Sequence, residues 1–168
     1  MTIHKAKYQS PLGEIVITAD EDAITGLWFT QQRHFPMSVA TAAVAETPML
    51  QRAAQWLDAY FAGENPSIDF PLRAQGTRFR EAVWEELRQI PYGQTTTYGA
   101  IAAKLAAPGQ QMSARAVGQA VGHNPISILI PCHRVVGSDD SLTGYGGGLD
   151  RKTALLQLEG VQVLPGCD

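Results

Sequence analysis

Residues 124–137 read NPISILIPCHRVVG, an apolar run that leads straight into a cluster of reactive side chains. The run 126–130 is short and rich in β-branched residues, which predicts a buried strand. Pro125 disfavours helical geometry in the residue before it, so a turn should precede this strand. Cys132 and His133 follow directly, and reactive groups placed by a rigid element are typical of an active site.

Cys132 is a candidate nucleophile, because a thiolate attacks electrophiles and a neighbouring imidazole can take the thiol proton. His133 is that neighbour, and Glu159, which follows the helical stretch 152–158, is the best candidate to orient it. Taken singly, a buried apolar cysteine and a satisfied core histidine remain alternative interpretations. The other cysteine is Cys167, and no Cys-x-x-Cys pair occurs, so we expect no metal and no cofactor.

Upstream of this cluster the sequence predicts three helices joined by short connections. The first begins at the cap Thr77. After the extended piece 95–97 come a helix over 98–106 and a third over 113–121, capped by Ser113. Helices in this succession indicate a helix-turn-helix module, a signal that is weak when taken alone.

The third helix is almost bare of side chains, and its small residues are Ala114, Ala116, Gly118, Ala120 and Gly122. A bare helix permits close approach to a sugar–phosphate surface, but it equally permits tight packing against another helix. Arg115 is the exception on this helix.

The charge distribution points in two directions. The net charge of −3 argues weakly against a nucleic-acid partner. However, no Asp or Glu occurs between Glu86 and Asp139, and the cations of that window are Arg88, Lys104, Arg115 and Arg134. A phosphate backbone attracts such a segment, whereas a buried segment of small residues would also have no use for acids. Both interpretations remain open on charge alone.

The N-terminal part predicts a structural scaffold without a chemical constellation. Residues 8–29 have the pattern of antiparallel strands, and residues 47–61 form an amphipathic helix. The Pro- and Gly-containing connector 66–76 predicts a boundary between domains 1–75 and 76–168.

The composition excludes several classes of protein. With 168 residues, 45% hydrophobic and 17% charged, the chain is neither disordered nor fibrous. No apolar run approaches the roughly 20 residues that cross a bilayer, and the N-terminus has no signal-peptide pattern. Two cysteines make no disulfide framework, so we expect a cytoplasmic protein.

Several blocks together resemble the methylated-DNA–protein-cysteine methyltransferase (alkylguanine-DNA alkyltransferase) family. They are Asn124-Pro125, the run 126–130, Pro131-Cys132-His133-Arg134-Val135, Gly144 to Leu149 with Lys152, Arg115-Ala116-Val117-Gly118, and Tyr92-Gly93 with Tyr98. The resemblance is close over 77–160 and loose before it. It implies an α+β fold, with a small antiparallel sheet and helix (ribonuclease H-like) followed by a helical, winged-helix-like DNA-binding domain that carries the cysteine.

The resemblance implies DNA repair by direct reversal of damage, in a single turnover. Cys132 would irreversibly accept the alkyl group of O6-alkylguanine, with O4-alkylthymine as a further candidate, from a base flipped out of the duplex. His133 would be the general base, acting through a water, and Glu159 would orient it. Asn124 would brace the turn behind the nucleophile, and Tyr98 would crowd a phosphate and contact guanine N3.

The resemblance also implies contacts with DNA and with the base. Arg115 would fill the space that the flipped guanine leaves. The other DNA-contacting residues would be Ser113, Ala114, Ala116, Gly118, Thr96, Tyr98 and His123. The base pocket would include Val135, Tyr145, Gly146, Gly147 and Lys152. The expected partner is double-stranded DNA that contains alkylated guanine, and we expect a monomer that does not bind membranes.

The chain departs from the family pattern in places. The link 109–112 is longer than in some relatives, and His123 stands where a small residue is common. Gly146 replaces the serine of some relatives, which favours tolerance of bulkier alkyl groups, and Cys167 matches no motif. The sequence argues against two other functions. An alkyltransferase-like damage binder would lack the acceptor cysteine, and a Cys-His hydrolase or thiol oxidoreductase would need an oxyanion loop or a Cys-x-x-Cys pair.

Overall fold

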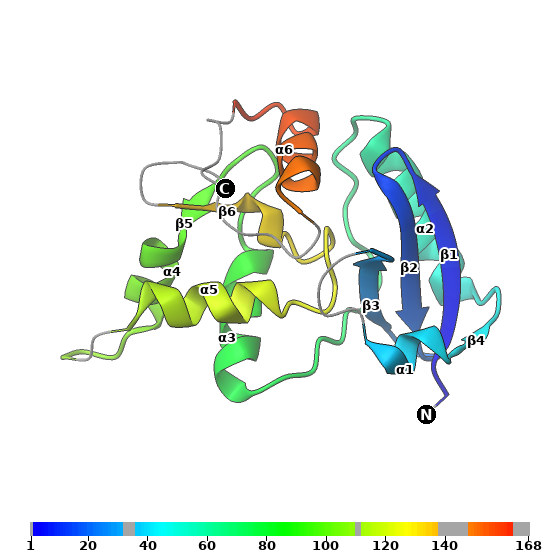
Figure 1. Cartoon of the computed structure of the whole chain (residues 1–168), viewed down its shortest axis with the longest axis horizontal. Helices are drawn as coiled ribbons and strands as arrows, with labels where there is room; N and C mark the ends of the chain where they lie inside the picture. The colour runs from blue at the N-terminus through cyan, green and yellow to red at the C-terminus, as the bar shows by residue number, and fades with distance from the viewer. Residues whose placement is uncertain (1, 32–35, 110–111, 138–147, 163–168) are drawn as a thin grey trace. The chain divides into compact units, whose positions relative to one another are not determined.

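The computed structural model in Figure 1 describes residues 2–31, 36–109, 112–137 and 148–162. The chain forms two compact units: unit 1 comprises residues 1–75 with 125–129, and unit 2 comprises 76–124 with 130–168. Helices and strands occur in both, so the expected α+β class is confirmed. None of the helices in the described ranges is long and apolar enough to cross a membrane.

Unit 1 is built on a four-stranded sheet whose strands are β1 (His4–Ser10), β2 (Gly13–Ala19), β3 (Ile24–Phe29) and β4 (Ala43–Val44), in the order β3-β2-β1-β4. The first three strands are antiparallel, as the sequence predicts. β4 is a short edge strand that pairs parallel to β1, and it follows a one-turn helix, α1 (Met37–Ala40). Neither α1 nor β4 has a signal in the sequence pattern.

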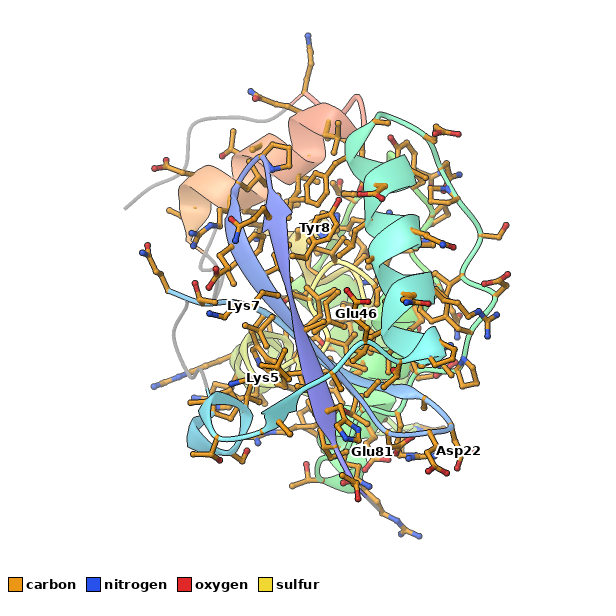
Figure 2. The ribbon with its side chains drawn as sticks, turned by 90° about the vertical axis from the view of Figure 1, so that its right-hand side faces the viewer. Lys5, Lys7, Tyr8, Asp22, Glu46 and Glu81 are labelled. Carbon is orange, nitrogen blue, oxygen red and sulfur yellow. The ribbon has the colours of Figure 1, made fainter. Side chains whose placement is uncertain are left out.

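Helix α2 (Pro48–Phe61) packs on the sheet of unit 1 and agrees with the predicted helix. The hydroxyl of Thr47 accepts the N–H of Leu50 at 3.2 Å, which satisfies one of the free donors at the helix start. Tyr8 on β1 lies beside α2 in Figure 2 and donates its O–H to Asp58 at 2.7 Å. The apolar face of α2 therefore packs on the sheet, as the periodicity of its sequence predicts.

The connector of residues 66–76 extends the sheet of unit 1 through backbone contacts. Leu72 forms a parallel bridge with Ile24, and the N–H of Arg73 donates to the carbonyl of Ile24 at 2.8 Å. The connector is therefore ordered up to the start of the next unit.

A partly buried ion pair attaches this connector to residue 20. The Arg73 guanidinium donates to the Asp20 carboxylate, which also accepts the N–H groups of Asp22 and Ala23 at 2.8 and 2.9 Å. Burial alone would raise the pKa of Asp20, but these backbone hydrogen bonds and the Arg73 charge outweigh it and lower the pKa below its ordinary value.

Unit 2 contains three packed helices, α3 (Arg78–Arg88), α4 (Tyr98–Leu105) and α5 (Ala114–Gly122), and α5 contacts both of the others (Figure 1). The side chains of Thr77, Thr97 and Ser113 cap their first turns. The indole N–H of Trp84 donates to the carbonyl of Ala120 at 2.8 Å, which ties α3 to α5. The predicted succession of helices is confirmed, with ends that differ by a residue or so.

The rest of unit 2 consists of short elements around these helices: β5 (Thr96–Thr97), the 3-10 helix η1 (Cys132–Arg134), β6 (Val135–Val136) and α6 (Leu149–Leu158). β5 and β6 form a parallel pair in which Thr96 lies opposite Val135. This pair joins the segment before α4 to the segment that follows the cysteine.

The predicted strand over 126–130 is wrong. Ile126 makes an isolated bridge with Leu27, and the chain then turns over residues 127–129. Ile128 adopts a φ of +69°, which a β-branched residue rarely does. The side chains are nonetheless buried. The apolar composition of this run therefore predicts its burial, but it does not by itself determine the backbone conformation.

Candidate active site

Cys132 lies at the start of η1 and is buried, with 5% of its surface exposed. Its backbone N–H donates to the carbonyl of Ile130 at 2.7 Å, and the N–H of Arg134 donates to that of Pro131 at 3.0 Å. These bonds close a tight turn around the sulfur. The thiol is therefore held in place by its own backbone.

His133 is fully buried and is held by one carboxylate. Its Nε2 donates to Oε2 of Glu159 at 2.7 Å, and Glu159 is the C-cap residue that follows α6. Its Nδ1 is buried and has no hydrogen-bond partner among the residues that the structure describes. With the proton on Nε2, the imidazole keeps a lone pair on Nδ1.

The environment keeps this imidazole neutral. Burial lowers the pKa of His133, and the hydrogen bond and charge of Glu159 oppose that shift without cancelling it. The charges of Arg134 and Lys152 lower the pKa further. His133 is therefore available as a proton acceptor at neutral pH.

Glu159 accepts hydrogen bonds from three groups besides His133. Nε and Nη2 of Arg134 donate to its two oxygens at 2.8 and 3.1 Å, and the N–H of Gly93 donates to Oε1 at 3.0 Å. Sequence reasoning gave no role to Arg134 or Gly93. Their only signals were the arginine of the Pro-Cys-His-Arg block and the Tyr92-Gly93 turn.

Lys152 on α6 places a buried amine in the same unit, with its Nζ 5.9 Å from the centre of the Tyr98 ring. Burial lowers the pKa of Lys152 to about 8, and the electrostatic influence of Cys132 acts in the opposite direction. A cation beside a sulfur stabilises its thiolate form. Tyr98 is the first residue of α4, so this contact links α4 to α6.

Asn124 is buried directly after α5, and its Nδ2 donates to the carbonyl of Ile130 at 2.8 Å. Ile130 is the same residue whose carbonyl accepts the N–H of Cys132. Asn124 and the backbone of Cys132 therefore share the Ile130 carbonyl as acceptor, which gives the expected bracing of this turn a physical basis.

The residues expected at DNA lie on α5 and near it. Ser113, Ala114 and Arg115 are exposed at the start of the helix, whereas Ala116 and Gly118 are partly buried. A Cβ added at Gly118 would lie 3.7 Å from the Tyr98 ring, so the small residue reflects packing against α4 as well. Thr96 is half-buried in β5, and exposed His123 donates from Nδ1 to the carbonyl of Gln119 at 2.7 Å.

Part of the expected base pocket falls outside the described residues. Val135 is buried in β6. Tyr145, Gly146 and Gly147 lie outside the ranges that the structure describes, as do most of the departures, namely Gln110, Gln111, Gly146 and Cys167. Within the described ranges, no group of three His, Cys, Asp or Glu side chains is arranged to hold a metal ion.

Comparisons with known proteins cover nearly the whole chain. The family model described as 6-O-methylguanine DNA methyltransferase, DNA binding domain, matches residues 78–161, and that of the ribonuclease-like domain matches residues 3–74. A methylated-DNA–protein-cysteine methyltransferase of Mycobacterium tuberculosis is 45% identical, over 94% of this chain and 92% of the relative. One from Methanosarcina acetivorans is 42% identical, over 94% and 99%.

Solved structures agree with these matches. The crystal structure of Mycobacterium tuberculosis O6-methylguanine methyltransferase matches with a TM-score of 0.83 at 42% identity, over 94% of this chain and 93% of that one. The structure of Mycobacterium tuberculosis OGT in complex with DNA matches with a TM-score of 0.80 at 42% identity, over 95% and 92%. The expected ribonuclease-like and DNA-binding parts are thus confirmed. The chain therefore belongs to the O6-methylguanine DNA methyltransferase family, and to the enzyme class of methylated-DNA–protein-cysteine methyltransferases.

Proposed function

We propose that this chain repairs DNA by moving the alkyl group from O6 of a damaged guanine to Sγ of Cys132, once per molecule. O4-alkylthymine is the further candidate substrate. The family supplies the reaction class. The observation that carries the residue assignment is the His133 imidazole, one residue after the cysteine. Glu159 holds its Nε2, and its Nδ1 has no hydrogen-bond partner in the described part of the chain.

The transfer is a displacement at carbon. The thiol proton of Cys132 passes through a water to Nδ1 of His133, since that nitrogen carries the lone pair. The thiolate then forms the S–C bond while the C–O6 bond breaks, and the electron pair stays on guanine. The guanine anion takes up a proton from solvent and the His133 imidazolium later releases one to solvent, so hydrogen replaces alkyl on the base without a net change of charge. Glu159 stabilises the imidazolium that forms, at 2.7 Å from Nε2.

Two further groups supply electrostatic stabilisation. The Lys152 ammonium favours the thiolate, because burial strengthens the attraction between the two charges. Tyr98 begins α4 and contacts Lys152 through its ring. We assign to it the contact with the target nucleotide and a hydrogen bond donated to guanine N3. Asn124 keeps the cysteine turn in register through the Ile130 carbonyl.

DNA binding is assigned to α5 and its neighbourhood. The exposed N-terminal turn, Ser113 to Arg115, presents small side chains and one guanidinium, which suits close approach to a groove. The damaged atom is inaccessible inside a duplex, so the base must be everted. Arg115 fills the vacated space, Thr96 and His123 contact the backbone, and Val135 lines the pocket together with residues 145–147.

The stability of the product limits each molecule to a single turnover. A thioether is stable in water, and the neutral His133 offers no route to cleave it, so each molecule reacts irreversibly. We assign residues 76–168 to binding and transfer and residues 1–75 to a structural role, which the family matches at 78–161 and 3–74 support. We further propose that the protein is a monomer and acts in the cytoplasm.

The decisive experiment mixes the protein with a duplex that contains one O6-methylguanine and measures its intact mass. We expect a gain of one methyl group in place of the thiol proton, in a one-to-one ratio with repaired duplex. Cys132→Ala should abolish the gain, and peptide mapping should place the methyl on Cys132. Cys167→Ala is the matched control, since it removes the other thiol and should leave the gain unchanged.

Two outcomes would overturn the proposal. Tight binding to the methylated duplex without a mass gain would indicate a damage binder. A gain that persists in Cys132→Ala would mean that another residue accepts the alkyl group. Replacement of methyl by benzyl at O6, in the parent and in Gly146→Ser, tests the preference for alkyl size, and equal relative rates would contradict the suggested tolerance of Gly146.

A further inference from the structure

Arg134 uses every nitrogen of its guanidinium inside unit 2. Nε and Nη2 grip the two oxygens of Glu159 at 2.8 and 3.1 Å, and Nη1 donates to the carbonyl of Ile90 at 2.7 Å. The side chain is only 12% exposed, and that of Glu159 is fully buried. This forked contact is the geometry that guanidinium offers and ammonium does not.

The carboxylate that results is saturated. Glu159 accepts from Arg134 twice, from the N–H of Gly93 and from Nε2 of His133, which fills about four acceptor positions of a carboxylate. With its other positions occupied, Oε2 stays aligned on Nε2. That alignment keeps the imidazole proton on Nε2 and the lone pair on Nδ1.

We infer that Arg134 is a positioning residue for alkyl transfer, since it fixes both oxygens of Glu159 and thereby holds His133 as the tautomer that can accept the cysteine proton. The inference rests on the proposed function and adds to it a residue outside the relay of cysteine, imidazole and carboxylate. The guanidinium of Arg134 is engaged with Glu159 and Ile90, so it acts on the imidazole through Glu159.

The same guanidinium anchors the turn that precedes α4. Its carbon lies 5.8 Å from the centre of the Tyr92 ring, and its bond to Ile90 holds the start of that turn. The hydroxyl of Tyr92 approaches the carbonyl of Leu158 at 3.4 Å. The segment that leads to Tyr98 is therefore fixed to the carboxylate that orients His133.

The test compares Arg134→Lys and Arg134→Gln with the parent in single-turnover transfer of methyl from a duplex, from about pH 5 to about pH 9. Arg134→Gln should slow transfer on the order of 10- to 100-fold, by analogy with the loss of a hydrogen-bond partner that orients a histidine ligand in metal sites. Arg52→Gln is the matched control, because Arg52 pairs with Asp69 on the surface of unit 1.

The pH profile separates positioning from mere structural support. The charged groups that act on His133 are Glu159, Arg134 and Lys152. Arg134 is among the causes that lower the pKa of His133, so its loss should move the acid limb of the profile to higher pH. Arg134→Lys keeps the charge without the fork. This variant should therefore keep the acid limb close to its parental pH but recover only part of the parental transfer rate.

A double variant tests whether the effect passes through the carboxylate. In a Glu159→Gln background, Arg134→Gln should slow transfer by less than about threefold, because the carboxylate that Arg134 contacts is already lost. Multiplying effects would overturn the inference. So would parental rates and an unchanged pH profile in a folded Arg134→Gln protein, with folding checked by near-UV circular dichroism.

A measurement without activity distinguishes this inference from the proposed function. Nitrogen NMR of labelled histidine should show the neutral Nε2–H tautomer of His133 in the parent and its loss or mixing in both Arg134 variants. If the parent shows this tautomer but never takes up methyl, the proposed function fails while the positioning role stands. If the tautomer is unaltered in the variants, the positioning role fails.

Discussion

Replacing Lys152 by Met removes a buried charge while keeping an unbranched side chain of similar length. Lys152 lies on α6 with no exposed surface, and burial lowers its pKa to about 8 from an ordinary 10.5. At 1.36 kcal/mol per pKa unit, keeping this amine protonated costs about 3 kcal/mol of folding free energy. A marginally stable domain retains such a cost only where the charge has a use.

The sign of the pH dependence follows from the direction of that shift. The pKa of Lys152 is lower in the folded chain, so between about pH 8 and 10.5 the unfolded chain binds more protons. The stability of the parent should therefore rise across this window. Lys152→Met should be more stable than the parent by up to about 3 kcal/mol at pH 7, and the difference should vanish above the window.

Urea unfolding at several pH values measures both effects, and single-turnover transfer measures the functional loss. We expect Lys152→Met to be slower in transfer, because its thiolate loses a neighbouring cation. Lys104→Met is the control, since Lys104 is 66% exposed on α4 and should change stability little. A Lys152→Met protein that is less stable than the parent at pH 7, with parental transfer, would refute the reasoning.

Three more predictions follow from single contacts. Gly93 has a φ of +77°, and a Cβ there would meet the Glu159 carbonyl at 3.2 Å, so Gly93→Ala should cost about 1–2 kcal/mol in thermal unfolding, and a neutral substitution would contradict this. The pKa of Asp20 is lowered in the folded chain, so its contribution to stability is present above about pH 4 and is lost as the pH falls below that value; Asp20→Asn should abolish this part of the acid dependence in urea titrations. In DNA-binding titrations against salt, Arg115→Gln should reduce the slope by about one, whereas Arg134→Gln should leave it unchanged, because Arg134 faces Glu159.

Local signals explain what could be predicted of the fold. Thr77 and Ser113 were expected to cap helices, and each side chain accepts a backbone N–H of the first turn. Caps and periodicity act within a few residues, so a sequence reports them directly. The elements that were missed, such as α1, β4 and β6, have four residues or fewer, and their conformation is set by neighbours distant in sequence.

The candidate site divides in the same way. The Cys132-His133 pair is a local motif, whereas the contact of His133 with Glu159 spans 26 residues and was expected because a carboxylate follows the helical stretch 152–158. The contact of Arg134 with Glu159 also spans 25 residues, and the motif that contains Arg134 does not indicate its partner. A long-range ion pair depends on how α6 returns to η1, and no periodicity encodes that return.

The acid-free window shows where composition misleads. Its cations suggested a footprint for phosphate, yet Arg88 pairs with Glu85 and Lys104 with Glu86, both at 3.6 Å, and Arg134 is directed at Glu159. In the described part of the chain, Arg115 is the member of the window that has no carboxylate partner. Under the proposed function, affinity for DNA should depend less on the charge of this window than on the close fit of α5, on backbone donors and on the guanidinium of Arg115. A negatively charged chain can therefore hold a polyanion, provided that its acids face inward or away from the docking helix.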